Sequence, residues 1–328
     1  MDESAFITID AEQVAALVEE HLPLLACTLR PDYRAALEAA LLSETNERGR
    51  AALEQLITNA HIAESESLPL CQDTGYVWVC LEVSGAVYVA ADVFSGVDAA
   101  VARASEAGGL RMSLVHDALV NRTNTGTNSP AFCEVVQRGV VQRDGVGVPL
   151  FASKSGTPTP SLCTTPAPSL CTKPTPSLCA THSATLHVML KGGGSDNASA
   201  QTMLPPSAGV EGVLDFVAQA VANKGANACP PLVLGVGVGR SFDSVASLAK
   251  HALLRPVGSV HPNEEIAALE TELLTRINAL GIGPGGLGGS TTALAVHIES
   301  APSHIASLPV AVNIGCTALR SISLNLSE

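Results

Sequence analysis

Short apolar runs alternate with longer amphipathic segments through the second half of the chain, between residues 183 and 316. The runs TLHVML, PLVLGVGV, TTALAVHIES and LPVAVNIGC are typical of β-strands because they are short, apolar and bounded by turn residues. The segments between them, such as VEGVLDFVAQAVANKG and EEIAALETELLTRINALG, repeat apolar residues at three- and four-residue spacing, which indicates helices. This alternation predicts a domain in which helices pack on a sheet.

The first 65 residues have a different, helical pattern. The segments AEQVAALVEEHLPLL, DYRAALEAALLSE and NERGRAALEQLITNAHIA each show helical periodicity, and they are separated by Pro31 and by the polar cluster 43–46. From residue 68 the pattern changes to the β-prone runs VWVCLEVS and VYVAADV. We therefore predict the fold class α/β, of mixed α+β character, with a helical region at 1–65 leading into a mixed-sheet domain. The whole chain, 1–328, forms one domain in this prediction.

Composition and charge narrow the class of protein. The chain has 328 residues, of which 15 % are charged, and a formal net charge of −13. These values are typical of a tightly packed enzyme and argue against nucleic-acid binding, which normally needs a basic surface. The N-terminus shows no targeting pattern, and no apolar run reaches the length of a membrane span. Nine cysteines without a secretion signal indicate a reducing compartment, so we predict a cytoplasmic protein.

A proline-rich repeat interrupts the pattern of strands and helices. Residues 155–182 contain the sequence PSLC three times at a period of eight residues. The repeat cysteines, Cys163, Cys171 and Cys179, could form a metal site, but near-identical copies are more typical of repeat expansion, and prolines block regular structure. We predict that the segment is a low-complexity insertion that forms a flexible loop, and that its cysteines bind no metal.

Three other cysteines stand next to glycine or proline at the edges of predicted strands: Cys71 in PLCQDTG, Cys229 in ANACPPL and Cys316 in NIGCTAL. At a strand edge a side chain can point into a cleft, where a thiolate can bind a metal. The sequence between them contains no CxxC signature, so the residues alone leave open both a shared metal site and three ordinary buried cysteines. The remaining cysteines lie inside apolar patterns, and we predict that they are core thiols: Cys27, Cys80 and Cys133.

Three loops are rich in glycine, amides or hydroxyls: NRTNTGTN at 121–128, LKGGGSDN at 190–197 and GIGPGGLGGSTT at 281–292. Glycine lets backbone N–H groups approach an anion closely, so such loops are candidates for anion binding. Any one of these loops taken alone is better explained as a set of tight turns.

Taken in order, these motifs resemble one family. CQDTG, NTGTN, KGGGSDN, ACPPLVLGVGVG, FDSVASLAKHALLRPVG, GIGPGGLGG and HIASLPVAVNIGC resemble the α subunit or N-terminal domain of the iron–sulfur class I hydro-lyases. This family includes class I fumarate hydratase and L(+)-tartrate dehydratase. The resemblance covers roughly residues 10–325, apart from the repeat insertion.

The resemblance implies a cofactor, a 4Fe–4S cluster held by the thiolates of Cys71, Cys229 and Cys316. A cluster bound by four cysteines is coordinatively closed, whereas three cysteines leave one iron open as a Lewis acid for a substrate hydroxyl and carboxylate. A Lewis acid suits the reversible addition of water to a small dicarboxylate, because hydroxide is a poor leaving group. We expect fumarate and malate as the first substrate pair and tartrate dehydration as the next.

The resemblance also implies roles for residues in the other motifs. Carried over position by position, they are Asp73 as general acid/base, His304 as the active-site histidine, and Gln72, Arg111, Gly194, Asn124 and Thr125 as substrate contacts, with Asn128 beside them. From the residues alone, a solvated helix cap for Arg111 and a core position for His304 stay open.

The family's second part, which supplies its own substrate arginine, has no counterpart in this sequence. The resemblance therefore implies a separate β subunit, an α2β2 assembly and an active site shared between the chains. Two alternatives remain. A NAD(P)-type oxidoreductase is suggested by Gly235, Gly237 and Gly239, although their spacing is GxGxG rather than GxGxxG. A non-catalytic cluster-binding protein would need the three cysteines but no substrate.

Overall fold

The computed structural model describes residues 7–85, 87–138 and 182–327. Except for its last residue, the predicted insertion at 155–182 lies outside these ranges, so its flexible-loop character stays a prediction. After a short first strand, three helices follow one another along the chain, and strands that form mixed sheets then alternate with helices. This arrangement confirms the predicted fold class.

The N-terminal elements begin where the sequence supplies helix caps. Asp10 precedes the first helix, and its carboxylate accepts a hydrogen bond from the backbone N–H of Gln13 at 2.9 Å. Asn46 caps the third helix by accepting from two backbone N–H groups. Such acceptors satisfy donors that the first turn of a helix leaves unpaired. The elements in this region are β1 (Ile7–Ile9), α1 (Ala11–Cys27), α2 (Pro31–Ser43) and α3 (Glu47–Glu66).

Two four-stranded sheets and one two-stranded pair are formed by the described residues. Across the first sheet the order is β10 (Arg320–Asn325), β5 (Ser183–Lys191), β2 (Tyr76–Ser84) and β4 (Phe132–Arg138). Across the second sheet the order is β6 (Ala200–Leu204), β9 (Leu308–Gly315), β7 (Leu232–Arg240) and β8 (Ala293–Ser303). The pair consists of β1 and β3 (Val87–Val89).

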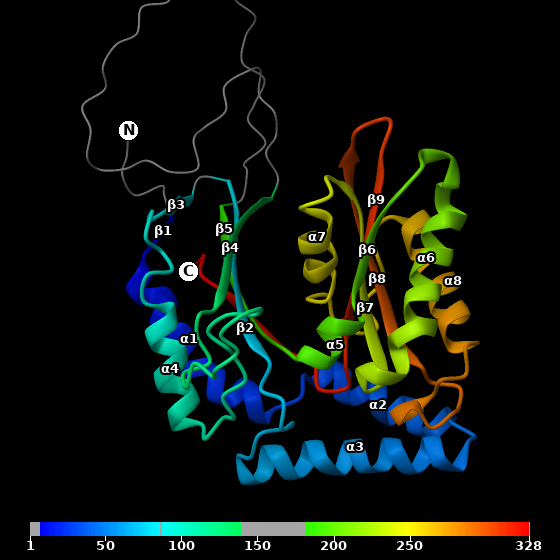
Figure 1. Cartoon of the computed structure of the whole chain (residues 1–328), viewed down its shortest axis with the longest axis horizontal. Coiled ribbons are helices and arrows are strands. Elements are labelled where there is room, and N and C mark those ends of the chain that lie inside the picture. The colour runs from blue at the N-terminus through cyan, green and yellow to red at the C-terminus, as the bar shows by residue number, and fades with distance from the viewer. Residues whose placement is uncertain (1–6, 86, 139–181, 328) are drawn as a thin grey trace, which may run out of the picture.

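Helices cover both sheets (Figure 1). α1 and α4 (Val97–Ala107) pack on the first sheet. α7 (Val245–Ala252) lies on one side of the second sheet, and α6 (Gly209–Lys224) and α8 (Glu264–Asn278) lie on the other. α3 runs beneath both halves of the molecule, and α2 lies beneath the second sheet. Short helical turns lie in connections: α5 (Gly193–Ala198), η2 (Pro206–Ala208), η3 (Gly225–Ala228) and η4 (Pro284–Gly286).

A buried apolar cluster joins the two sheets to α2. It includes Tyr33 and Leu37 of α2, Trp78 of β2, Val233 of β7 and Leu319. Close-packed interiors resist displacement, so these contacts hold the neighbouring strand ends of the two sheets in fixed positions. The candidate site described below lies at these strand ends.

The glycines of β7 have a structural explanation. A Cβ atom at Gly235 would lie 2.1 Å from the carbonyl oxygen of Ala249, and one at Gly237 would lie 2.6 Å from that of Val245. Both glycines therefore let α7 pack directly on β7. A dinucleotide fingerprint lies in the turn between a strand and a helix, whereas these glycines lie within the strand. The feature that suggested a NAD(P)-type oxidoreductase is thus a helix-packing surface.

The glycine-rich loop GIGPGGLGGSTT binds a carboxylate of the same chain, that of Glu44. The carboxylate of Glu44, which is only 2 % exposed, accepts hydrogen bonds from the backbone N–H groups of Thr45, Asn46, Ser290 and Thr291 at 2.8–3.1 Å. The hydroxyl of Ser290 donates to it as well, at 3.0 Å. The loop therefore anchors the α2–α3 turn to the second sheet, and its donors are used within the fold.

We expect Glu44→Gln to lower the free energy of unfolding by about 2–4 kcal/mol at neutral pH, because the amide leaves buried N–H groups unpaired. Burial raises the pKa of Glu44, but the N–H of Asn46 and the hydroxyl and N–H of Ser290 outweigh burial, so the pKa is lowered. The stabilisation is therefore present above the unfolded pKa of about 4.3 and is lost as the pH falls through the folded pKa.

Urea denaturation of both proteins across this pH range checks the prediction. The difference between wild type and Glu44→Gln should shrink on acidification. Glu54→Gln, at an exposed position of α3, is the matched control and should leave the free energy of unfolding nearly unchanged. Equal unfolding free energies of wild type and Glu44→Gln at neutral pH would contradict the role of Glu44.

Candidate active site

The structure brings three cysteines from distant parts of the sequence to one cavity. Cys71 precedes β2, Cys229 precedes β7, and Cys316 directly follows β9. All three line a cavity of about 330 Å³, which we call the thiol cavity. Gln72, Asp73 and Gly194 line the same cavity, so six of the residues singled out from the sequence lie together.

The segment that carries Cys71 is held by hydrogen bonds on both sides of the thiol. The backbone N–H of Leu70 donates to the carbonyl of Ala26 at 2.9 Å, and the Asn59 amide donates to the carbonyl of Leu70 at 2.9 Å. The backbone N–H of Asp73 lies 3.4 Å from Cys71 Sγ and donates to it. This contact orients the sulfur of Cys71 at the wall of the thiol cavity.

The other two cysteines are tied to each other through the backbone. The N–H of Thr317 donates to the carbonyl of Cys229 at 3.0 Å. The hydroxyl of the fully buried Tyr33 lies 2.9 Å from the carbonyl oxygen of Pro231 and 3.1 Å from that of Cys316. Burial raises the pKa of Tyr33 well above its ordinary value, so the phenol stays a donor. One buried side chain of α2 thus contacts both cysteine-bearing segments.

Cys229 lies close enough to the other two cysteines for their charges to influence its ionisation. Burial raises the pKa of Cys229, and the negative charges of Cys316, Cys71 and Asp73 raise it further. Within the described ranges no three His, Cys, Asp or Glu side chains could bind a single metal ion. A cluster of several irons takes one thiolate per iron, so it demands wider spacing than one ion does.

Gly192 and Gly194 of the KGGG motif line the thiol cavity and form a glycine wall there. The nearest neighbour of a Cβ atom would lie at 3.9 Å for Gly193 and at 3.7 Å for Gly194, and neither residue has a positive φ. Glycine in a helix costs about 1 kcal/mol relative to alanine. Neither packing nor backbone conformation requires glycine at these two positions of α5. A ligand that approaches the backbone would require it, so the residues present fit a bound group.

Asp73 lies on the cavity wall between the CQDTG and KGGG motifs. Its Oδ1 accepts from the N–H of Gly75 at 2.9 Å, and its Oδ2 accepts from the N–H of Gly193 at 2.8 Å. A Cβ atom at Gly75 would lie 2.3 Å from the carbonyl oxygen of Lys191, so this position requires glycine. Asp73 is therefore a fixed, half-buried carboxylate that can hold or transfer a proton inside the cavity.

Arg320 is a buried cation in the same cavity. The residue is only 2 % exposed, and its guanidinium donates to the carbonyls of Ala318 at 3.0 Å, Asp73 at 2.9 Å and Thr74 at 3.2 Å. Burial lowers the pKa of Arg320, and the negative charges of Cys316 and Cys71 oppose this. Sequence reasoning missed Arg320. The available signal was an arginine that opens an apolar strand just after the NIGC motif.

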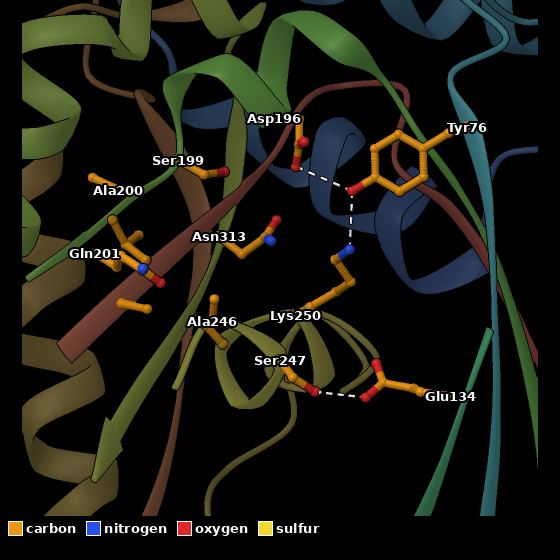
Figure 2. Close-up of a pocket in the computed structure, with 13 residues that line it drawn as sticks. Tyr76, Glu134, Asp196, Ser199, Ala200, Gln201, Ala246, Ser247, Lys250 and Asn313 are labelled. Atoms are coloured by element: carbon orange, nitrogen blue, oxygen red, sulfur yellow. Dashed lines mark hydrogen bonds between the residues drawn. The ribbon is translucent and has the colours of Figure 1, made fainter. Parts of the chain in front are cut away.

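A second cavity lies next to α5, the short helix that begins within the KGGG motif and is called the KGGG helix below (Figure 2). Its volume is about 420 Å³. Six polar side chains in its lining are those of Tyr76, Glu134, Asp196, Ser247, Lys250 and Asn313. Within it the hydroxyl of Ser247 donates to the Glu134 carboxylate at 2.8 Å. This cavity holds side chains of both charges, and sequence reasoning did not anticipate it.

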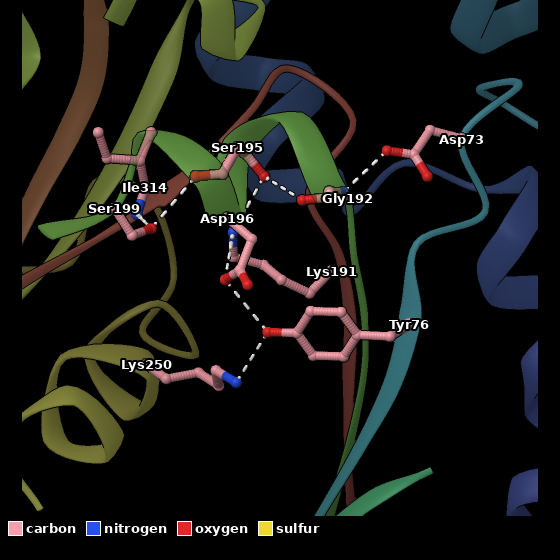
Figure 3. A network of polar contacts seen from close by, with 10 residues as sticks. Asp73, Tyr76, Lys191, Gly192, Ser195, Asp196, Ser199, Lys250 and Ile314 are labelled. Carbon is pink, nitrogen blue, oxygen red and sulfur yellow. Dashed lines mark hydrogen bonds and ion pairs between the residues drawn. The ribbon is translucent and has the colours of Figure 1, made fainter. Parts of the chain in front are cut away.

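A polar network connects the second cavity with the KGGG helix (Figure 3). Lys250 donates to the hydroxyl of Tyr76 at 2.9 Å, and that hydroxyl donates to Asp196 Oδ1 at 3.2 Å. The fully buried Lys191 donates to the hydroxyl of Ser195 at 3.0 Å and lies 3.5 Å from Asp196 Oδ1. Burial lowers the pKa of Lys191 to about 8, although the charge of Asp196 opposes this. The network fixes the start of α5 against the thiol cavity.

Comparison with known proteins shows which family the chain belongs to. Residues 15–170 and 169–325 match the family model described as Fumarate hydratase (Fumerase). The chain belongs to the fumarate hydratase family. Similar proteins include "Putative L(+)-tartrate dehydratase subunit alpha" of Methanocaldococcus jannaschii, 36% identical over 316 residues, with 94% of this chain and 95% of that protein covered. "L(+)-tartrate dehydratase subunit alpha" of Escherichia coli strain K12 is 30% identical over 308 residues, with 94% of this chain and 89% of that protein covered.

These matches confirm the resemblance to α-type chains of the class I hydro-lyases, and the chain is a hydro-lyase of that family. The two matched parts meet within the proline-rich repeat. None of the helices in the described part of this chain is long and apolar enough to cross a membrane.

Four of the predicted polar residues lie outside the lining of the thiol cavity. Arg111 is exposed, and its carbonyl accepts from the amide of the buried Asn128 at 3.1 Å. The Asn124 amide donates to the carbonyl of Met112 at 2.8 Å, and the N–H of Thr125 donates to the carbonyl of Leu114 at 2.9 Å. Within this chain these residues hold their own loop together, and their contacts with substrate stay predictions.

His304 lies at the opposite end of β9 from Cys316. It is exposed in the turn between β8 and β9, where its Nδ1 accepts from the N–H of Ala306 at 3.1 Å. β9 has eight residues, and a strand of that length spans about 25 Å. The structure therefore does not bring His304 to the thiol cavity of the same chain, and its catalytic role stays a prediction.

The remaining cysteines differ from one another in burial. Cys80 is buried in β2, as predicted. Cys27 is half-buried against the apolar core between α1, α4 and the first sheet. Cys133 is exposed, so its prediction as a core thiol is wrong. It lies in β4, which ends the order of the first sheet and has a paired strand on one side. Alternating apolar residues cannot distinguish such an edge strand from a central one.

Proposed function

We propose that this chain is the α subunit of a 4Fe–4S-dependent hydro-lyase that reversibly adds water to, or removes it from, a small dicarboxylate. Fumarate and malate are the first substrates in this proposal, and tartrate is the next. The observation that carries it is the thiol cavity, where Cys71, Cys229 and Cys316 lie beside a carboxylate and an open glycine wall. Membership of the fumarate hydratase family supports the reaction class.

Each cysteine would hold one iron of the cluster. When bound, a cluster with one iron free of protein ligands supplies a Lewis acid for the hydroxyl group that leaves or adds. Asp73 would hold or transfer a proton at its carboxylate, which the N–H groups of Gly75 and Gly193 keep in place. Fixed donors of this kind position a group without reorganisation during the reaction.

Two buried cations would favour an anionic substrate. Arg320 lines the thiol cavity, and Lys191 lies fully buried at the start of the KGGG motif. Positive groups in a cleft attract anions even when the whole protein carries a negative net charge, which is −13 here. Gln72 and Gly194 lie exposed in the cavity lining, where they could contact a bound dicarboxylate.

A β subunit would complete the site. The relatives bear the words "subunit alpha" in their names, which supports a separate second chain, and we propose an α2β2 assembly of the two. Cys229 is exposed, so the cavity is accessible to such a partner. The exposed Arg111, Asn124 and His304 are available for contacts in an assembled site as well. The chain by itself would then bind the cluster and catalyse little or no turnover.

The first test is the content of iron and acid-labile sulfide in the anaerobically purified protein. We expect a 4Fe–4S cluster in the wild type and its loss in Cys71→Ser. Joint replacement of Cys163, Cys171 and Cys179 by serine is the control and should leave the cluster intact. A wild-type chain that binds no iron and sulfide after reconstitution would refute the proposal.

The second test compares fumarate, malate and tartrate as substrates of the complex with the β subunit. Activity should decay in air and return with ferrous iron and a thiol, because an iron without a protein ligand is readily lost. A complex that holds the cluster and turns over none of these compounds would favour the non-catalytic cluster-binding alternative. Air-stable, iron-independent turnover would refute the mechanism.

A further inference from the structure

The two four-stranded sheets repeat one arrangement. In the first, β2 pairs with β4 in parallel and with β5 antiparallel, and β5 pairs with β10 antiparallel. In the second, β7 pairs with β8 in parallel and with β9 antiparallel, and β9 pairs with β6 antiparallel. The chain order is the same as well, because β2, β4 and β5 correspond to β7, β8 and β9.

The two halves exchange their last strands. β6 follows β5 in the sequence but joins the second sheet, and β10 follows β9 but joins the first. The connections at 192–199 and 316–319 therefore both cross from one half of the molecule to the other. Each crossing starts at the same place in its half, directly after the strand that pairs antiparallel with the central strand.

The thiol cavity lies where these corresponding segments meet. Its lining includes the segments that enter β2 and β7, with Cys71 and Cys229, and the segments that leave β5 and β9. Contacts across the cavity correspond as well. The N–H of Thr317 in one crossing donates to the carbonyl of Cys229, and the N–H of Gly193 in the other donates to the carboxylate of Asp73.

Three of the four corresponding segments place a thiol in the cavity. Cys316 is the first residue after β9, and the first residue after β5 is Gly192. Gly192 has φ −67° and ψ 139°, which any residue can adopt. A Cβ atom there would lie 3.2 Å from Asp73 Oδ2 and 3.8 Å from the hydroxyl of Ser195. A side chain at 192 would therefore start in the cavity lining, beside the proposed acid/base.

We propose that Gly192 occupies the fourth ligand position of an internally repeated site, and that its missing side chain leaves one coordination position open to substrate beside Asp73. The proposal rests on the proposed 4Fe–4S function. It explains why a chain of two corresponding halves supplies an odd number of thiolates. It also names the glycine wall and Asp73 as the surface that a bound dicarboxylate contacts.

Gly192→Cys tests the proposal by supplying the fourth thiolate. Oxidation by ferricyanide, which accepts the electron, releases an iron that no thiolate holds and leaves a three-iron cluster with a characteristic electron paramagnetic resonance signal. We expect this signal in the wild type and its loss in Gly192→Cys at unchanged iron and sulfide content. Gly192→Ala adds a side chain without a thiolate, and it should give the wild-type signal.

A mirror-image variant keeps the test decisive if Gly192→Cys alone folds poorly. Cys316→Gly should lose the cluster, and Cys316→Gly combined with Gly192→Cys should recover iron and sulfide, because three corresponding positions again hold thiolates. Circular dichroism verifies the fold of each variant. A cluster in Gly192→Cys that still forms the three-iron species, or no recovery in the folded double variant, would overturn the inference.

Measurements on the wild type distinguish failure of the proposed function from failure of the proposed role of Gly192. A wild-type chain without iron and sulfide refutes the proposed function itself. A wild-type cluster that loses one iron on oxidation, together with an unchanged response in Gly192→Cys, leaves the proposed function standing and refutes the role of Gly192.

Discussion

Asp73→Asn is expected to lower kcat of the assembled enzyme by about 10²–10⁴-fold, the range that general acid–base groups contribute. The amide keeps the shape of the carboxylate and one acceptor for the N–H groups of Gly75 and Gly193, but it cannot exchange a proton at neutral pH. The Cys71 segment keeps its other hydrogen bonds, so iron content should stay at the wild-type level.

Steady-state kinetics of the αβ complex, with iron and sulfide measured on the same samples, checks this result. Asp215→Asn changes an exposed carboxylate on α6 and is the control for the loss of one negative charge. It should leave kcat unchanged. Undiminished kcat in Asp73→Asn with a full cluster would remove Asp73 from the proton transfer and move that role to another group.

Arg320→Met is expected to lower the free energy of unfolding of the iron-free chain by about 3 kcal/mol, because buried carbonyls left without a donor cost about 1–3 kcal/mol each. The carbonyls concerned are those of Asp73, Thr74 and Ala318. The first two flank the Cys71 segment, so their release should also lower cluster content. Arg320→Lys restores a cation and should recover part of both losses.

Urea denaturation and iron analysis test both parts of this prediction. Arg276→Met is the control, because the Arg276 guanidinium pairs with Glu211 and Glu272 at the surface, where ion pairs contribute little. It should leave stability and iron content nearly unchanged. If Arg320→Met bound the cluster as well as the wild type, Arg320 would be a structural residue without influence on the site.

Some of the predicted site residues lie in the thiol cavity and others do not. CQDTG and KGGG are short motifs, and the structure places Gln72, Asp73 and Gly194 in the thiol cavity with the three cysteines. Arg111 and His304 rested on the resemblance alone, and in this chain they lie away from that cavity. Matching single positions does not encode the long-range folding that places a residue at the cavity or away from it.

The burial of three charged side chains could not be predicted from the sequence, for a different reason. Lys191 and Arg320 resemble ordinary polar residues at strand ends, and they are buried where the connections after β5 and after β9 cross from one sheet to the other. The same holds for Glu44, which looks like a surface residue after α2 until the glycine-rich loop supplies its donors. Burial of a polar group depends on long-range packing, which no local pattern encodes.

The sequence by itself determined the N-terminal helices, the strands β2, β5, β7, β8 and β9, the fold class and the family, because periodicity, caps and ordered motifs are set by residues close together along the chain. The strands β1, β4, β6 and β10 emerged only from the structure. The tertiary structure decided what these elements accomplish. It assigned Gly235 and Gly237 to helix packing, placed Cys133 on an edge strand, and brought Cys71, Cys229 and Cys316 to one cavity. That convergence follows from two sheets that exchange strands, and such pairing joins residues too far apart in sequence for any local rule to relate them.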